Sequence, residues 1–470
     1  MGEGMAESGL HYETILDMSD ALRERKLSPV ELTRAMLDRV ASLDPKLHAY
    51  ALVTPDLALD QARRAEAEIA RGNYRGRLHG VPIAVKDLCH TAGVPTAAGM
   101  TVHADFKPDR DATVVRRLAD AGAVLLGKLQ LTEGAFSEHH PTIEAPRNPW
   151  NAAHWSGASS SGSGVATAAG MCFGSLGSDT GGSIRFPSAA NGITGLKPTW
   201  GRVSRHGVFA LADSLDHVGP MTRSAADAGI MLGAIAGADP DDPTALAASV
   251  PDYLATLGAG LRDVRIGVDP RYNGDGTDPV VTAALAAVRN ALEASGAAFR
   301  EVAVPSPGAV IAGWVPLCSV ETAIAHEATY PARAEEYGPA LRKLLDTAGT
   351  VSAMQLMKIQ QARLVFSGAL SHLFETIDLL LVPVHPFADL TIERKTTLLN
   401  SAEGLVGALR YTAPFDMSGS PTITLPGGFT ADGLPIGFQL VARHLDEALL
   451  VRAGHAYQQA TDWHRRHPPL

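Results

Sequence analysis

Hydrophobic residues follow two spacings that alternate along most of the chain. Ser28, Pro29 and Glu31 form a combination typical of a helix start, and Leu32 and Met36 then begin a helical spacing of apolar residues. The same spacing predicts helices over residues 55–72, 111–122, 165–169 and 279–295, and long helical stretches over 315–378. Short apolar runs predict buried strands over residues 81–85, 124–126, 264–269, 299–304, 379–384 and 434–443.

This alternation of helices and strands is typical of an α/β fold. We predict a single large domain over residues 1–470, with a mixed, mostly parallel β-sheet core flanked by α-helices. Residues 1–72 are expected to form an N-terminal helical part of this domain. The sequence has no internal repeat, low-complexity tract or long polar linker that would separate a second domain.

Composition and charge narrow the function. The 470 residues are 46% hydrophobic, enough for a sizeable core, and the formal net charge of −10, without a Lys/Arg-rich block, argues against a nucleic-acid partner. The start "MGEGMAESGLHYE" lacks a signal sequence, and no apolar run reaches the ~18 residues of a membrane span. Three widely separated cysteines indicate neither a disulfide framework nor a zinc ribbon. We expect a cytoplasmic protein without a membrane partner, and the sequence is compatible with a homo-oligomer.

Two Gly/Ser-rich stretches and one lysine segment are the candidates for chemistry. They are "WSGASSSGSGVATAAG" (155–170), "GSDTGGSIRFPSAANG" (177–192) and "HGVPIAVKDL" (79–88). A flexible linker and a phosphate-binding loop are alternatives for the first, but structured segments flank it and no lysine follows its glycines. "GAVLLGKL" (122–129) imitates a phosphate-binding loop, yet Leu129 stands where Ser or Thr is required, so we interpret it as a structural strand.

Lys86 lies at the end of a predicted strand, where α/β sheets carry their functional groups. A serine attacks a carbonyl efficiently only when a base removes its proton, and lysine is such a base when it is neutral. A neutral lysine near pH 7.5 requires its pKa to fall by ~3 units, which burial beside the apolar run "VPIAV" would supply. Glycines before Ser183 leave room for N–H groups that stabilise an oxyanion.

Together, these segments resemble the amidase signature family. "GASSSGSG", "GSDTGGSIRFPSAANGITGLKPT" and the preceding "GVPIAVKD" match the core of its signature, and "SGSPTITLPGG" and "LPIGFQLVAR" are similar to its C-terminal part. The resemblance implies a metal-independent mechanism without a cofactor. Its catalytic residues would be Ser183 as nucleophile, Ser159 as a bridging serine on a cis peptide bond and Lys86 as base. It further assigns an oxyanion hole to Thr180, Gly181, Gly182 and Ser183 and structural support to Asp179 and Arg185.

Three positions refine this picture. Ala158 stands where many members have glycine before the bridging serine. Phe186 follows the Ser-Ile-Arg run, where the glutaminase subunit of a tRNA-dependent amidotransferase usually has glutamine. By analogy, the segment "TEGAFSEHH" (132–140) would line the acyl pocket near Gly134, with Phe136 as a wall. We interpret its adjacent histidines, His139 and His140, as structural rather than as a metal site, because neighbouring loop residues rarely ligate one ion well.

We therefore predict hydrolysis of a C–N bond in a small, aryl or otherwise apolar amide or carbamate, as in a urethanase, through a serine acyl-enzyme. The glutaminase (A) subunit of a tRNA-dependent amidotransferase is the alternative within the family. A non-catalytic binding protein on the same fold and a metal-dependent hydrolase are alternatives from other classes.

Overall fold

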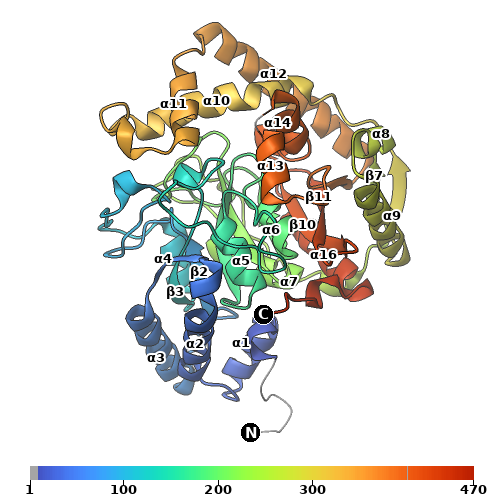
Figure 1. The fold of residues 1–470 in the computed structure, drawn as a ribbon. Helices are drawn as coiled ribbons and strands as arrows, with labels where there is room; N and C mark the ends of the chain where they lie inside the picture. Colours follow the sequence, from blue (N-terminus) through green and yellow to red (C-terminus); the bar gives the residue numbers. More distant parts are fainter. Residues whose placement is uncertain (1–8, 400) are drawn as a thin grey trace.

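The computed structural model describes residues 9–399 and 401–470 (Figure 1). In this part of the chain, one sheet of eleven strands runs through the molecule in the order β1-β3-β2-β4-β6-β5-β10-β11-β9-β7-β8. Its strands are β1 (Tyr50–Val53), β2 (Pro82–Lys86), β3 (Val124–Leu129), β4 (Gly174–Asp179), β5 (Thr194–Lys197), β6 (His217–Thr222), β7 (Arg265–Val268), β8 (Ala298–Glu301), β9 (Leu379–Pro383), β10 (Thr422–Phe429) and β11 (Pro435–Ala442). The predicted α/β class and its mixed sheet are confirmed.

The pairing within the sheet differs from the expected mostly parallel arrangement. Of the ten neighbouring pairs in the described residues, four are parallel and six antiparallel. The parallel pairs lie near the two ends of the sheet, in β3-β2-β4 and β9-β7-β8. The centre is antiparallel because β10 and β11 form a hairpin joined by residues 430–434, and β5 and β6 also pair antiparallel. Apolar runs predict burial but carry no direction, so the sequence pattern overestimated the parallel share.

Helices cover both faces of this sheet (Figure 1). Helices α5 and α6 pack against each other and against central strands, while α16 packs with α7 and α9 as a second group. The α-helices are α1 (Ile15–Arg23), α2 (Pro29–Leu47), α3 (Pro55–Ala70), α4 (Thr113–Asp120), α5 (Ser161–Ala168), α6 (Arg185–Asn191), α7 (Ala225–Ile235), α8 (Pro270–Gly274), α9 (Pro279–Ala294), α10 (Gly308–His326), α11 (Pro339–Ala348), α12 (Ala353–Thr376), α13 (Ile392–Leu399), α14 (Ala402–Leu409), α15 (Ala413–Met417) and α16 (Glu447–Ala460).

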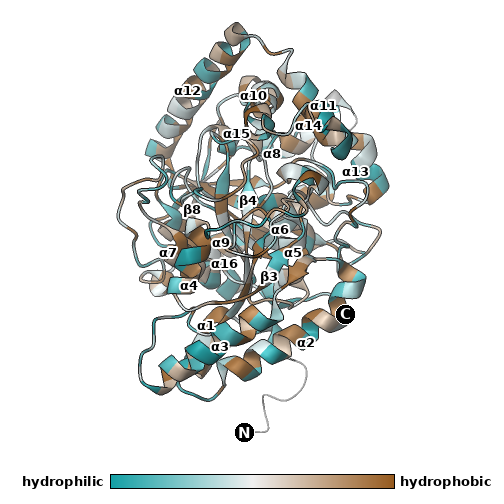
Figure 2. Cartoon of the chain, turned by 90° about the vertical axis from the view of Figure 1, so that its left-hand side faces the viewer, coloured by the Kyte–Doolittle hydropathy of each residue, from teal (hydrophilic) through white to brown (hydrophobic). Residues whose placement is uncertain are grey.

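The N-terminal part combines helices with one edge strand. Helix α2 begins where its sequence predicts, because the Ser28 side chain accepts hydrogen bonds from the N–H groups of Val30 and Glu31. Figure 2 shows hydrophilic and hydrophobic residues alternating around α2 and α3, as expected for helices that cover a core with one face. Strand β1, between them, pairs antiparallel with β3. The N-terminal part is thus built into the same sheet as the rest of the described chain.

Helix α10 is, among the described residues, the one helix long and apolar enough by length and composition to cross a membrane, with a mean hydropathy of 1.5. Ser319, Glu321 and Thr322 interrupt its apolar residues, so α10 is not an uninterrupted apolar run of the kind considered in the sequence. Within the fold, α10 packs against α11 and α12 (Figure 1), and also against α15. Its apolar composition therefore serves contacts inside the domain.

Candidate active site

Lys86 is the last residue of β2 and is completely buried. Its Nζ donates hydrogen bonds to Ser159 Oγ (2.7 Å) and Ser178 Oγ (2.9 Å). Because β2 and β4 are parallel neighbours, their carboxyl ends meet at one edge of the sheet, which brings Lys86 next to Ser178 and Asp179. The geometry places Lys86 within hydrogen-bonding reach of the serine to which the sequence analysis assigns the bridge.

Burial determines the charge of Lys86. Removal from water lowers the pKa of this amine to about 7, against the weaker opposing influence of Cys89, Asp216 and Asp179. Its two hydrogen-bond partners are hydroxyl groups rather than carboxylates. A substantial fraction of Lys86 is therefore neutral near pH 7, as a general base requires.

Ser159 lies in a Gly/Ser segment that is packed into the core. Residues 156–170 are all buried, so this segment is no flexible linker. The peptide bond between Ala158 and Ser159 is cis. A side chain at Gly162 would place its Cβ 2.3 Å from the Ala49 carbonyl oxygen, so the glycine allows α5 to approach the neighbouring backbone. Ser160 N–H donates to the Ser183 carbonyl (3.3 Å), which joins the two serine segments directly.

The turn that carries Ser183 is held by Asp179 and Arg185. Asp179 accepts hydrogen bonds from the backbone N–H groups of Gly182 (2.6 Å) and Ile184 (2.9 Å), and it receives two more from the Arg185 guanidinium. Arg185 also contacts Asp416 Oδ2 at 2.5 Å. Although desolvation opposes ionisation, the buried Arg185 keeps the pKa of Asp179 well below its usual range. These contacts fix the backbone on both sides of Ser183.

Further contacts to this turn come from distant parts of the chain. Trp314 Nε1, on α10, donates to the Thr180 carbonyl (2.8 Å), and Thr412 Oγ1 donates to the Gly181 carbonyl (2.6 Å). Thr180 Oγ1 donates to Asp216 (2.5 Å). The Thr180 carbonyl shares its peptide plane with the Gly181 N–H, so the bond from Trp314 orients that N–H group in advance of any substrate.

The set of free N–H donors is smaller than the four residues that the sequence assigns to the oxyanion hole. The Gly182 N–H donates to Asp179 Oδ1 in this structure, so it is not among the free donors. In residues 9–399 and 401–470, no hydrogen bond uses the N–H groups of Thr180, Gly181 or Ser183. These three groups are the candidates for binding a developing oxyanion.

Ser183 is half-buried and lines a cavity of about 490 Å³. The walls of this cavity, called the Ser183 cavity below, are mainly aromatic and aliphatic. They include Phe136, Trp155, Leu211, Trp314, Leu344, Phe387, Leu390, Leu398, Leu405 and Leu409. Such a volume and lining suit a small, largely apolar ligand.

Two predicted pocket residues differ in their placement. Phe136 lines the Ser183 cavity as expected, together with its neighbours Ser137 and Glu138. Gly134 is not among the lining residues; its Cα faces Leu341 and His326, where an added Cβ would approach within 2.9 Å. Gly134 therefore supports the wall from behind, and its left-handed backbone (φ 55°) turns the chain so that Phe136 reaches the cavity. Phe186 also lines the cavity.

The histidine pair makes separate local contacts. His139 Nε2 lies 3.0 Å from Ser161 Oγ, and His140 Nδ1 lies 2.7 Å from Thr142 Oγ1. Burial lowers the pKa of His139 to about 4, so this imidazole is neutral. Across the described part of the chain, no three His, Cys, Asp or Glu side chains are grouped so that they could hold a metal ion.

Sequence reasoning missed several residues that shape the site. Ser178 stands inside the quoted "GSDTGG" segment, and its place one residue before the strand end was the available signal. Trp314, Thr412 and Asp416 come from segments 130 or more positions away, without a local signal that relates them to the turn. Their role follows only from the assembled fold.

Comparison with known proteins gives a consistent picture. The family model described as Amidase matches residues 31–451. A Mycobacterium tuberculosis protein named AmiD, provisionally assigned as an amidase, is 51% identical over 464 residues, covering 99% of this chain and 97% of that protein. The A subunit of the glutamyl-tRNA(Gln) amidotransferase of Chloroflexus aggregans is 38% identical over 487 residues, 98% of this chain and 99% of its own length.

Solved structures agree with these sequence matches. A peptide amidase from Stenotrophomonas maltophilia is 31% identical with a TM-score of 0.81, over 97% of this chain and 98% of the other. A 6-aminohexanoate cyclic dimer hydrolase, solved with its substrate, is 26% identical with a TM-score of 0.88, over 98% and 99% of the two chains. The range matched by the family model, residues 31–451, contains all eleven strands and the Ser183 turn.

Proposed function

Because this chain belongs to the amidase signature family and is a hydrolase of that family, we propose that it cleaves the C–N bond of a small apolar amide or carbamate through an acyl-enzyme on Ser183. Lys86 acts as the base, Ser159 relays the proton, and Thr180, Gly181 and Ser183 supply the oxyanion donors. The supporting observation is the buried cluster in which Lys86 Nζ lies 2.7 Å from Ser159 Oγ and has no carboxylate as hydrogen-bond partner.

The proposed reaction has two steps, acylation of Ser183 and hydrolysis of the acyl-enzyme. In the first, Ser183 Oγ attacks the carbonyl carbon while its proton passes to Ser159 Oγ, whose own proton passes to Lys86 Nζ. The tetrahedral oxyanion then collapses, the C–N bond breaks, and the leaving nitrogen takes a proton back from Lys86 through Ser159. In the second step, water attacks the acyl-enzyme by the same proton path and releases the acid and Ser183.

The cavity supports an apolar substrate. Ser183 opens onto walls formed mainly by rings and aliphatic chains, and Phe186 adds a ring where the glutaminase subunit of the amidotransferase usually has glutamine. Matching aryl and aliphatic groups would be removed from water there, a favourable contribution of ~25 cal/mol per Å² of apolar surface. The peptide and cyclic-dimer amides named for the two solved relatives are further members of the same bond class.

Active-site labelling tests the nucleophile. We expect a fluorophosphonate probe to label the chain at Ser183 and to leave Ser183→Ala unlabelled. Ser137→Ala is the matched control, because Ser137 lines the same cavity and should label normally. A folded wild-type chain that remains unlabelled would favour the alternative of a non-catalytic binding protein.

A substrate panel tests the reaction. 4-Nitroacetanilide and an aryl carbamate should be hydrolysed by the chain alone, with a fatty amide and glutamine for comparison. Activity lost to a chelator and restored by zinc would favour the metal-dependent alternative. The 38% identity to an amidotransferase component makes glutaminase the second candidate. Glutamine turnover only in the presence of the other amidotransferase components, without aryl activity, would establish that candidate instead.

A further inference from the structure

The Ser183 cavity contains three formally charged side chains among its mainly apolar walls: Glu138, Lys343 and Lys395. Lys395 is almost fully buried and pairs with Glu138. These two charges neutralise each other inside the wall. Lys343 makes no ion pair anywhere in the described chain, so its ammonium is the one uncompensated charge of this cavity as the structure describes it.

Lys343 stands where the cavity meets the surface. It lies on α11 and is exposed, and it lines both the Ser183 cavity and a hollow of about 500 Å³ along the outside of the same helix. Pro339 and Thr347 are shared by both spaces in the same way. Helix α11 therefore separates the Ser183 cavity from this outer hollow, and Lys343 lies at the boundary between them.

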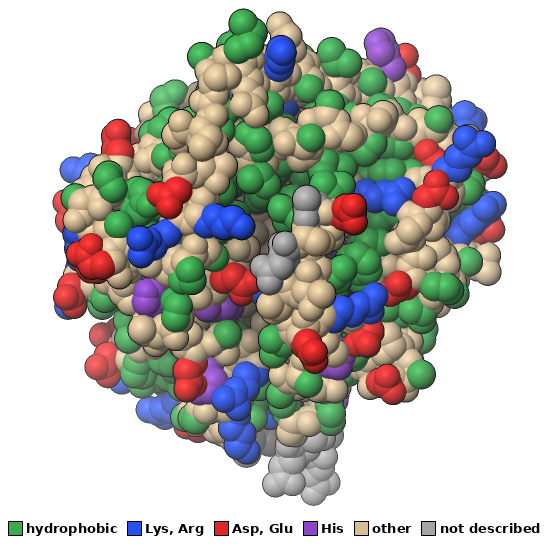
Figure 3. Space-filling view, turned by 45° about the horizontal axis from the view of Figure 1, so that its top comes forward, with side chains coloured by type: hydrophobic (Ala, Val, Ile, Leu, Met, Phe, Trp, Pro, Cys, Tyr) green, Lys and Arg blue, Asp and Glu red, His purple; other side chains and the backbone are tan. Residues whose placement is uncertain are grey.

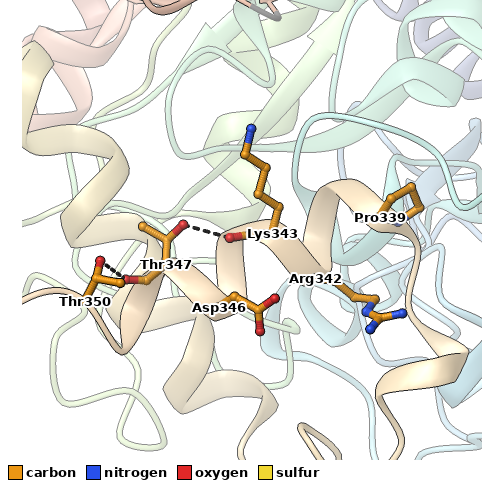
Figure 4. Close-up of a pocket in the computed structure, with 6 residues that line it drawn as sticks. All are labelled: Pro339, Arg342, Lys343, Asp346, Thr347 and Thr350. Carbon is orange, nitrogen blue, oxygen red and sulfur yellow. Dashed lines mark hydrogen bonds between the residues drawn. The ribbon is translucent and has the colours of Figure 1, made fainter.

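The other charges on α11 do not compensate Lys343. Figure 4 shows the Lys343 side chain extending to one side of α11, while Arg342 and Asp346 extend to the other. Asp346 accepts a hydrogen bond from the Tyr330 hydroxyl. Figure 3, which brings the top of Figure 1 forward, shows Lys and Arg side chains separated by hydrophobic ones over this face. Lys343 thus extends away from the other two charged side chains of this helix segment, and it lines both the Ser183 cavity and the outer hollow.

We propose that Lys343 forms an anion subsite at the mouth of the cavity and that preferred substrates carry a carboxylate at the end remote from the scissile amide. This inference rests on the proposed function, and it adds one carboxylate group to the otherwise apolar substrate proposed there. A formal net charge of −10 disfavours the approach of anions on average, so an acidic substrate would gain from a local cation beside the cavity. Apolar walls around Lys343 reduce screening and strengthen the pair relative to a fully exposed one.

Two pairs of probes test this subsite, one for each arm of the substrate. Glutaryl 4-nitroanilide and pentanoyl 4-nitroanilide differ by a carboxylate on the acyl arm. 4-Acetamidobenzoate and 4-nitroacetanilide differ by a carboxylate in place of a nitro group of the same shape on the amine arm. We expect Lys343→Met to raise KM about 5-fold for the acidic member of at least one pair. Lys343→Arg keeps the positive charge and should leave that KM at its wild-type value. The neutral member should change less than about 2-fold.

Arg342→Met is the matched control, because Arg342 is the neighbouring cation but does not line the Ser183 cavity. It should leave all four KM values unchanged. Calorimetric binding of the same probes to Ser183→Ala, with and without Lys343→Met, measures the subsite even where no turnover occurs, which separates its failure from failure of the proposed reaction. Equal effects of Lys343→Met on acidic and neutral probes, in both KM and binding, would overturn the subsite.

Discussion

Two buried lysines on neighbouring strands have opposite surroundings. Lys86 ends β2 and contacts the hydroxyl groups of Ser159 and Ser178. Lys128, in the adjacent strand β3, donates to the Cys89 carbonyl (2.8 Å) and Thr96 Oγ1 (2.7 Å) and lies 3.2 Å from the Asp87 carboxylate. Both side chains are fully buried, and burial lowers the pKa of each.

The difference lies in the counter-charge. The Asp87 carboxylate opposes the effect of burial on Lys128, so this lysine is part of a buried ion pair that holds two strand ends together. Lys86 has neutral partners and a pKa of about 7. A lysine with a carboxylate partner is suited to structure, and one with only hydroxyl partners is suited to proton transfer. Four experiments test this division, in decreasing order of expected effect.

The largest effect should be on catalysis. Lys86→Met removes the proposed base and should lower kcat for 4-nitroacetanilide by about 10³-fold, a typical value for loss of general-base catalysis. Lys128→Met, for the fraction that folds, should retain most of the wild-type kcat. Steady-state rates, normalised to the concentration of folded protein determined by circular dichroism, provide the measurement. Comparable loss in both variants would mean that the two lysines are not functionally distinct.

The second effect is on stability and has the reverse order. Lys128→Met leaves the Asp87 carboxylate, which is only 3% exposed, without its cation and should lower the free energy of unfolding by about 3–5 kcal/mol. Lys86→Met leaves only the Ser159 and Ser178 hydroxyl groups without their partner and should lower the free energy of unfolding much less. Urea unfolding at pH 7 measures both, and Asp87→Asn in the Lys128→Met background should restore part of the loss. A Lys86→Met protein less stable than Lys128→Met would contradict the comparison.

The third effect is on pH dependence. With a pKa of about 7 for Lys86, kcat/KM should rise with pH to a midpoint near 7 and fall about tenfold per unit below it. The folded pKa lies below the ordinary value of 10.5, so between pH 7 and 10.5 the unfolded chain holds a proton that the folded chain has released. Stability from this residue therefore increases with pH across that window. A kinetic midpoint near 10 would exclude Lys86 as the base.

The smallest effect should come from Ser178. Ser178→Ala removes one hydroxyl that accepts a hydrogen bond from Lys86 Nζ, and a charged ammonium depends on such an acceptor more than a neutral amine does. The kinetic midpoint should move to lower pH by a few tenths of a unit, while kcat at high pH changes only several-fold. Ser175→Ala, in the same strand but bonded to Thr167, is the control. An upward shift of the midpoint would show that Ser178 does not stabilise the charged form.

Much of the fold and the centre of the site could be predicted from the sequence. Residue spacing predicted the start of the helix at Pro29 and the bounds of the strands at residues 81–85 and 434–443 to within one residue, because amphipathic periodicity is local information. The Gly/Ser segments and their resemblance to the amidase signature family correctly brought Lys86 and Ser159 together. Their catalytic roles remain predictions.

The rest depended on contacts between distant segments. Asp87 and Lys128 are 41 positions apart, and no spacing rule relates them. The same holds for Thr412 and Asp416 against the Ser183 turn. Strand direction in the centre of the sheet was also beyond the pattern, because a fully buried strand is apolar whichever way it runs. Gly134 was assigned to the pocket by analogy, whereas its contacts with Leu341 and His326 place it behind the wall.

The tie between Arg185 and Asp416 spans 231 positions, and this has a consequence for biosynthesis. A ribosome that has released residues 1–400 has already made every proposed catalytic residue, but not the carboxylate and threonine that brace their turn. Closing so long a loop is slow compared with forming local helices. During refolding from urea, we therefore expect the circular-dichroism signal of the helices to return before Ser183 becomes reactive. A nascent chain should have no hydrolytic activity until its last quarter has joined the sheet.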